Sequence, residues 1–121
     1  MGARKYELSI PLPKQTTFEL LLEAGKRLPA SSELAGFQFE RWENTQADPE
    51  SGRLEWKMYD HKYASIILRA TLTDAEGGET HATFEVDRKG QYLDPMGLYK
   101  KTLRLLLDPF LDLVRQRTQK P

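Results

Sequence analysis

Residues 93–117 read LDPMGLYKKTLRLLLDPFLDLVRQR, and this longest run of helical character decides the fold. Its apolar residues cover more than the single stripe of a surface helix, so the helix needs a broad apolar surface to lie on. Asp94-Pro95 predicts its start, because Asp suits the N-cap and Pro the first helical position. Asp108-Pro109 predicts a kink or a restart, since Pro109 has no N–H to donate to the preceding turn. We expect residues 98–107 to cover a sheet and the residues after Pro109 to be free to meet a partner.

The N-terminal residues predict a strand followed by a helix. Apolar and polar side chains alternate over residues 4–12, which is typical of a half-buried strand. Its apolar face holds Tyr6, Leu8, Ile10 and Leu12. Thr16 and Glu19 have the spacing of a capping box, and apolar residues follow at helical spacing until near Pro29. We therefore expect a short helix with Thr16 as its N-cap.

Four strands and no further helix are predicted between these two helices. They cover Phe37–Trp42, Leu54–Met58, Ile66–Leu72 and Ala82–Val86. Strong turn sequences occupy residues 48–52 and 74–78. The alternation breaks at Arg41-Trp42, which predicts a bulge or places Trp42 on the other face of the sheet.

The order of these elements defines the fold class. It is β-α-β-β-β-β-α, and each strand has one apolar and one polar face, so we expect an antiparallel sheet that is covered on one side. The prediction is an α+β fold with a five-stranded antiparallel sheet, one face of which packs against a short N-terminal helix and a long kinked C-terminal helix. No linker or repeat interrupts the chain, so we expect residues 1–121 to form a single domain.

Composition excludes several classes of protein. The chain of 121 residues has 18 Lys and Arg against 18 Asp and Glu, and this balance argues against a nucleic-acid-binding protein. The absence of cysteine excludes disulfides, thiol nucleophiles and Cys-ligated metals. No signal-peptide core and no run long enough to span a bilayer is visible, so we expect a cytoplasmic protein without a transmembrane segment.

No residue pattern predicts a catalytic, cofactor or metal site. His61 and His81 lack a third ligand at a recognised spacing, and we interpret both as surface residues. The carboxylates fall in turns or on polar strand faces, where pairing with Arg53, Lys57 or Arg69 explains them. Phosphate-binding, dinucleotide-binding and nucleophile-elbow motifs are absent from the sequence.

Two segments carry a resemblance to a known family. They are Tyr6–Leu12 with the helix from Thr17, and the tail Gly97–Arg104 continuing to Leu113. They resemble the helix-grip superfamily of START-like, polyketide-cyclase-like and pathogenesis-related-allergen-like (SRPBCC) domains. The resemblance implies a sheet curved around a long C-terminal helix and the binding of lipids, sterols or polyketide-like molecules, with enzymes in the minority. This chain is shorter than typical members, which favours a shallow groove or a filled core as much as a deep cavity.

Bulky apolar residues could line a pocket between the sheet and the last helix. The candidate ligand-binding residues are Phe39, Trp56, Met58, Phe84, Leu103, Leu106 and Phe110. The other interpretation is that these residues form the core, because a domain of this size has little apolar mass to spare.

Three functional hypotheses follow. The first is a small non-enzymatic domain that binds an apolar, lipid-like ligand between the sheet and the C-terminal helix. The second is an interaction module with a filled core, which dimerises or docks a partner through a sheet edge or the C-terminal tail. The third is a cyclase-like enzyme of the same superfamily, for which Arg41 and Tyr59 are the candidates to point into a cavity. Lys100, Lys101 and Arg104 form either a solvated helix face or a contact for an anionic membrane or partner.

Overall fold

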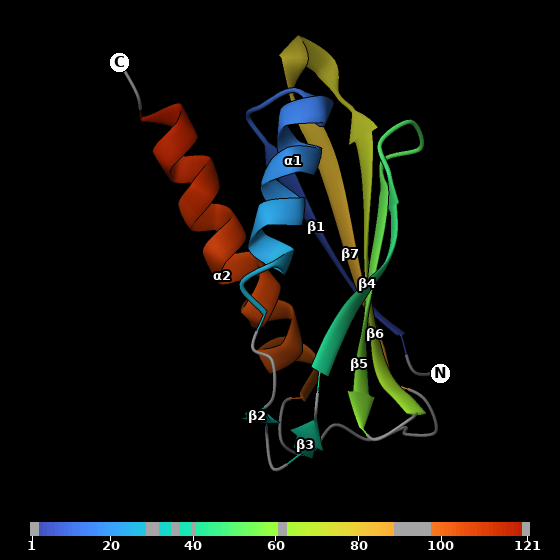
Figure 1. Ribbon diagram of the computed structural model, residues 1–121. Coiled ribbons are helices and arrows are strands. Elements are labelled where there is room, and N and C mark those ends of the chain that lie inside the picture. Colours follow the sequence, from blue (N-terminus) through green and yellow to red (C-terminus); the bar gives the residue numbers. More distant parts are fainter. Residues whose placement is uncertain are drawn as a thin grey trace.

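A computed structural model describes residues 3–28, 32–34, 37–39, 41–60, 63–88 and 98–119. In chain order the elements are β1 (Ala3–Ile10), α1 (Lys14–Gly25), β2 (Ser32–Leu34), β3 (Phe37–Phe39), β4 (Arg41–Asp48), β5 (Arg53–Asp60), β6 (Tyr63–Asp74), η1 (Glu76–Gly78), β7 (Thr80–Arg88) and α2 (Leu98–Thr118) (Figure 1).

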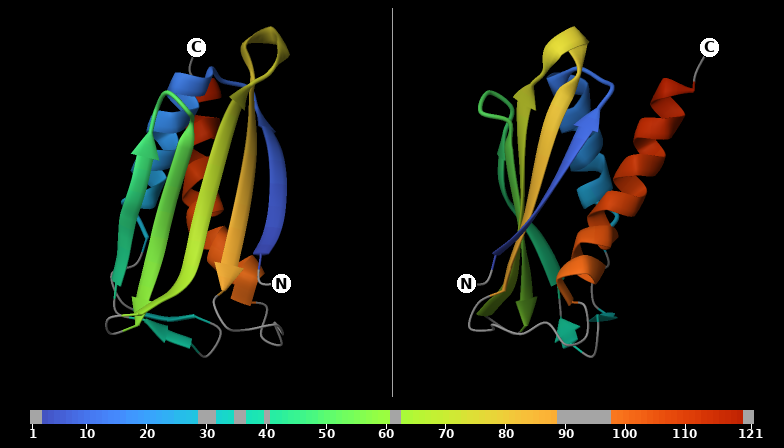
Figure 2. Two further views of the ribbon diagram at one scale, coloured as in Figure 1. Left: turned by 90° about the vertical axis from the view of Figure 1, so that its right-hand side faces the viewer. Right: turned by 180° about the vertical axis from the view of Figure 1, so that it is seen from behind.

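Five strands form one antiparallel sheet in the order β1-β7-β6-β5-β4, so β1 and β4 are its edges. Both helices lie on the same side of this twisted sheet (Figures 1 and 2). Along β5, Leu54, Trp56 and Met58 are buried, whereas the residues between them are at least partly exposed. This alternation is expected of a strand with one covered face. The predicted α+β fold with a five-stranded antiparallel sheet is confirmed.

The predicted strand Phe37–Trp42 is divided between two sheets. Its first residues form β3, which pairs with β2 in a separate two-stranded sheet, and Arg41 begins β4 of the main sheet. The sequence did not indicate β2, nor that β4 continues to Asp48. Most of β4 is exposed because it is an edge strand, so its residues lack the apolar alternation that reveals a strand. Its bulge lies between Asn44 and Gln46, beyond the position where the alternation broke.

Helix α1 begins earlier than the sequence predicted. Pro13 occupies the N-cap position and no side chain caps the helix, so the expected capping box at Thr16 is wrong. The Thr17 hydroxyl instead donates to the Pro13 carbonyl at 2.9 Å, and the Thr80 hydroxyl of β7 donates to the Leu12 carbonyl at 2.7 Å. The first bond closes the first turn of α1, and the second joins the segment before α1 to the sheet.

Helix α1 lies between the sheet and the C-terminal half of α2 (Figure 1). Its buried residues are Thr17, Phe18, Leu20, Leu21 and Ala24. They span a wider arc than the single stripe of a helix that packs on one side only, because α1 has neighbours on two sides.

Helix α2 runs through Pro109 without the restart that the sequence allowed. Pro109 cannot donate to the Leu105 carbonyl, which therefore lacks its helical partner. The residues after Pro109 were expected to leave the fold, and this expectation is wrong for two of them: Phe110 and Val114 are buried. The first turns of α2 lie against the sheet and its C-terminal end lies farther from it, with α1 between (Figure 2).

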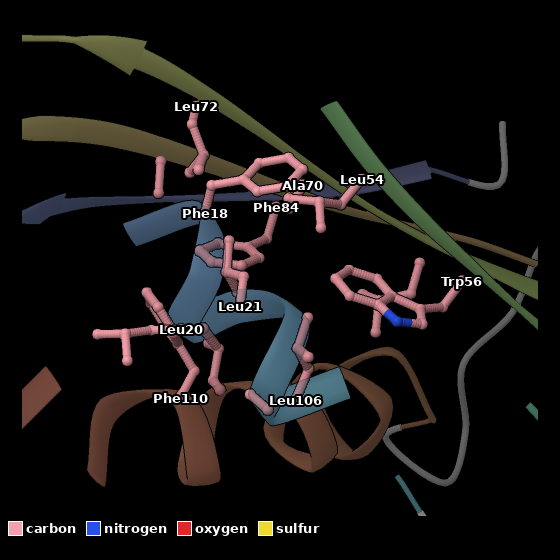
Figure 3. Close-up of a cluster of buried hydrophobic side chains, with 14 of the residues drawn as sticks. Phe18, Leu20, Leu21, Leu54, Trp56, Ala70, Leu72, Phe84, Leu106 and Phe110 are labelled. Carbon is pink, nitrogen blue, oxygen red and sulfur yellow. The ribbon is translucent and has the colours of Figure 1, made fainter. Parts of the chain in front are cut away.

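The core fills the space between the covered face of the sheet and the two helices (Figure 3). Phe84 of β7 and Phe110 of α2 lie near its centre, together with Leu21 of α1. In the described part of the chain, neither helix is long and apolar enough to cross a membrane.

Candidate ligand-binding pocket

A pocket of about 400 Å³ lies between the last turns of α1 and the strands β4 and β5. This volume is within the range of sites for small organic ligands. Its described lining consists of Leu22, Gly25, Lys26, Leu28, Arg41, Trp42, Asn44 and Trp56. None of these described lining residues is Asp or Glu, and both tryptophans of the chain are among them. An apolar wall with a few polar groups is the usual composition of a ligand site.

Trp56 forms one wall because α1 has a glycine where the ring approaches. A Cβ on Gly25 would lie 2.7 Å from Cε2 and 2.8 Å from Cζ2 of the Trp56 indole. No side chain fits at that separation, so the absence of one lets the indole lie directly against the helix backbone. In Figure 3 the ring points from β5 toward the residues of α1. Trp56 is 2% exposed.

Trp42 and Asn44 of β4 lie on the same sheet face as this wall. In the antiparallel register Trp42 is opposite Met58 and Asn44 is opposite Trp56, and opposite residues share a face. The Asn44 side-chain amide donates to the carbonyls of Gln46 at 3.0 Å and Glu55 at 2.9 Å. Asn44 thereby holds the bulge of β4 at the rim of the pocket.

Arg41 is part of the lining, but its guanidinium group is directed elsewhere. It stacks over the Tyr59 ring with 4.4 Å between Cζ and the ring centroid, and it pairs with Glu43 at 3.7 Å. Arg41 is opposite Tyr59 in the register, so both side chains belong to the uncovered face of the sheet. Lys26, at the C-cap of α1, is an exposed cation at the rim.

The predicted ligand-binding residues are distributed over three places. Trp56 lines the pocket. Four others are fully buried in the core between the sheet and the helices: Met58, Phe84, Leu106 and Phe110. Leu103 is partly buried against that core, and the side chain of Phe39 lies outside the described residues.

Sequence reasoning missed the contribution of α1 to the pocket. Leu22 and Leu28 continue the apolar spacing of the helix and carried no signal that distinguished them from core residues. A glycine inside a helical pattern does indicate either a helix end or a close approach by another group, and Gly25 could have been read that way. The partner in that approach could not be deduced, because it lies on a distant strand.

Ion pairs link neighbouring strands on the face of the sheet that is opposite the helices. Arg69 of β6 bonds Glu55 of β5 at 3.0 Å and Glu85 of β7 at 3.2 Å, and it lies 3.8 Å from Asp87. Burial alone raises the pKa of Glu55, but hydrogen bonds from Thr45 and Arg69 outweigh it and hold that pKa below its usual value. The predicted pairing of strand carboxylates with Arg69 is confirmed.

Of the two histidines, only His81 belongs to the described residues. His81 is half-buried at the sheet surface and pairs with Glu7 of the neighbouring strand at 2.9 Å. His61 lies outside the described residues. No group of three His, Asp or Glu side chains within the described ranges could hold a metal ion.

No protein-family model matches the sequence, and no curated protein does. Solved structures match nearly the whole chain. The Zhui aromatase/cyclase from Streptomyces sp. R1128 has a TM-score of 0.67 at 10% identity, over 97% of this chain and 95% of that one. Ara h 8.0201 has a TM-score of 0.62 at 12% identity, over 98% and 100%. A START superfamily protein from Mycobacterium smegmatis has a TM-score of 0.63 at 10% identity, over 96% and 99%. The chain therefore has the helix-grip fold that its sequence predicted.

Proposed function

We propose that this protein binds a small, mainly apolar ligand in the pocket between α1 and β4–β5. The observation that carries the proposal is the lining: two indole rings and two leucines form an apolar wall, with Lys26 and Asn44 at its rim. This location differs from the sequence hypothesis, which put the ligand between the sheet and the C-terminal helix. That space is occupied by Phe84 and Phe110, which pack on each other.

The structural neighbours support a ligand-binding role. One is an aromatase/cyclase and another a START superfamily protein, and the sequence resemblance implies lipids, sterols or polyketide-like molecules for such domains. A molecule with an apolar ring system or chain and a polar end fits this lining, because the polar end can stay at the rim beside Lys26.

A fluorescent probe tests the proposal. N-phenyl-1-naphthylamine emits strongly in apolar surroundings, and both tryptophans of the protein line the pocket, so they should transfer energy to the bound probe. We expect saturable binding of one probe per chain. Leu22→Trp would fill the pocket and abolish this binding, whereas Leu113→Trp, the same change at a partly buried residue outside the lining, would not. Absence of saturable binding to the wild-type protein would overturn the proposal.

Self-association through a sheet edge is a second candidate function. Tyr6 of the edge strand β1 is 45% exposed, and an edge strand presents unpaired backbone groups to a partner. Light scattering over a range of concentrations tests this: wild-type protein would dimerise and Tyr6→Lys would weaken the dimer. A concentration-independent monomer would exclude it. The C-terminal tail is a weaker candidate, because Phe110 and Val114 are used in packing.

A cyclase-like activity stays an alternative that no specific observation favours. Its candidate side chains, Arg41 and Tyr59, stack on each other at the uncovered face of the sheet, and neither is buried. A general acid or base needs a group aimed at the reacting atoms inside the pocket.

A further inference from the structure

The indole N–H of Trp56 is a hydrogen-bond donor that the folded protein leaves unused. The Trp56 residue is 2% exposed and lines the pocket, and no described residue accepts a hydrogen bond from its Nε1. The Nε1 atom itself is not fully buried and keeps contact with solvent, so it is open to the pocket that Trp56 lines. A tryptophan that is buried as a whole usually directs this N–H at an acceptor. A ligand in the pocket can supply the acceptor that the described residues do not.

The other donors of the pocket are less suited to this role. The Asn44 amide already donates to two backbone carbonyls. The Nε1 atom of Trp42 is buried, so a ligand in the pocket does not reach it. Lys26 is exposed at the rim, and lysine carries its ammonium group on a flexible four-carbon stem. Trp56 thus supplies the donor that belongs to the wall itself.

The donor is also held in a fixed position. Trp56 lies in β5, between Asn44 of β4 and Leu68 of β6 in the antiparallel register. Its ring lies against the backbone of α1 at Gly25, with Nε1 on the side nearest to that residue. A donor that is fixed before the ligand arrives loses little conformational freedom on binding, which favours affinity and selectivity.

We propose that Trp56 Nε1–H donates a hydrogen bond to a carbonyl oxygen of the ligand. The pocket then selects apolar molecules that carry a carbonyl group over hydrocarbons of the same shape. Trp56 is the residue that determines this selectivity, and Gly25 positions it. The inference rests on the proposed function, because it names the class of ligand for the same pocket.

Two matched compounds test the inference by displacement of N-phenyl-1-naphthylamine. The first is 2-acetylnaphthalene, and the second is 2-ethylnaphthalene, which has the same ring system without the oxygen. Trp56→Phe removes the donor and should lower the affinity for the ketone relative to the hydrocarbon by about two- to tenfold. Trp42→Phe, the same substitution at the other lining tryptophan, should leave this ratio unchanged. An unchanged ratio in Trp56→Phe would overturn the inference.

A measurement on the wild-type protein keeps the inference testable if Trp56→Phe does not fold. The chain has two tryptophans and therefore two indole N–H signals in a ¹⁵N–¹H NMR spectrum, which Trp42→Phe assigns. The Trp56 signal should move downfield with the ketone and stay nearly unchanged with the hydrocarbon. If the ketone and the hydrocarbon displaced the probe from the wild-type protein with equal affinity, the hydrogen bond would be refuted and the binding function would stay intact. Failure of both compounds and of the probe to bind would refute the proposed function, and this inference with it.

Discussion

The Phe110 ring packs on the Phe84 ring of β7, with 6.1 Å between the centroids and 58° between the planes. Phe110 directly follows Pro109, at the point where the sequence predicted a kink or a new helix. This tilted pair is a favourable aromatic geometry and holds the second half of α2 on the core. The residue directly after the proline is therefore anchored in the core.

Replacement of Phe110 by Ala should therefore destabilise the protein strongly. Both rings of the pair are fully buried, and deletion of a buried Phe side chain leaves a cavity that costs about 3–5 kcal/mol of the free energy of unfolding. Urea denaturation would measure this. Leu111→Ala, at a partly buried position one residue further on, is the matched control and should cost less. Equal losses in the two variants would mean that the Phe84–Phe110 pair does not hold α2 in place.

Gly25→Ala should move the Trp56 indole. The added methyl group would lie within 3 Å of two ring carbons, so the ring or the helix must shift, with a cost of about 1–3 kcal/mol. Thermal unfolding and tryptophan fluorescence would report the loss of stability and the altered environment of the ring. Combination with Trp56→Phe provides the check: the two changes should be less damaging together than the sum of their separate effects, because the smaller ring relieves the clash. Strict additivity would contradict a direct contact.

Gly52→Ala and Gly77→Ala should differ although both glycines have the same φ of 72°. Each alanine must adopt a left-handed conformation, which costs about 1–2 kcal/mol. At Gly52 the new methyl group would also meet the Leu72 carbonyl, whereas at Gly77 nothing lies within 4 Å. Gly52 additionally accepts a hydrogen bond from the Leu72 N–H at 2.8 Å. We expect the Gly52 variant to unfold at clearly lower urea concentration, and equal midpoints would disprove the role of the clash.

Arg69→Gln should reduce the pH dependence of stability. The pKa of Glu55 is lower in the folded protein than its usual 4.5, so its contribution to stability is present above about pH 4.5 and is lost as the pH falls through the folded-state pKa. Without Arg69 the pKa of Glu55 should rise toward the unfolded value. We expect a loss of about 1 kcal/mol or less near neutral pH, because Arg69 is 37% exposed and water weakens its ion pairs.

Urea midpoints at about pH 7 and about pH 3 would measure this effect. The difference between the two midpoints should be smaller in Arg69→Gln than in the wild type. Lys101→Gln, which removes an exposed charge from α2, is the control and should keep the wild-type difference. An unaltered pH dependence in Arg69→Gln would show that Glu55 is not held ionised by Arg69.

Much of the fold could be predicted from the sequence because its signals are local. Alternation in β5 placed Leu54, Trp56 and Met58 on the covered face, since successive side chains of a strand point to opposite sides. Turn sequences separated the strands, and the helical spacing of the tail identified α2. The start of α1 was predicted wrongly, because Pro13 takes the N-cap position and Thr16 therefore falls inside the helix, where it cannot cap it.

The position of the pocket could not be predicted from the sequence. The sequence by itself determined the two helices, the covered face of the strands that alternate clearly and the apolar surplus of the last helix, because side-chain period follows directly from backbone geometry. Only the tertiary structure decided that Gly25 meets Trp56, that Phe110 meets Phe84 and that a space remains beside α1. The physical reason is that such contacts join segments distant in the chain, and their positions depend on how all the side chains between them pack.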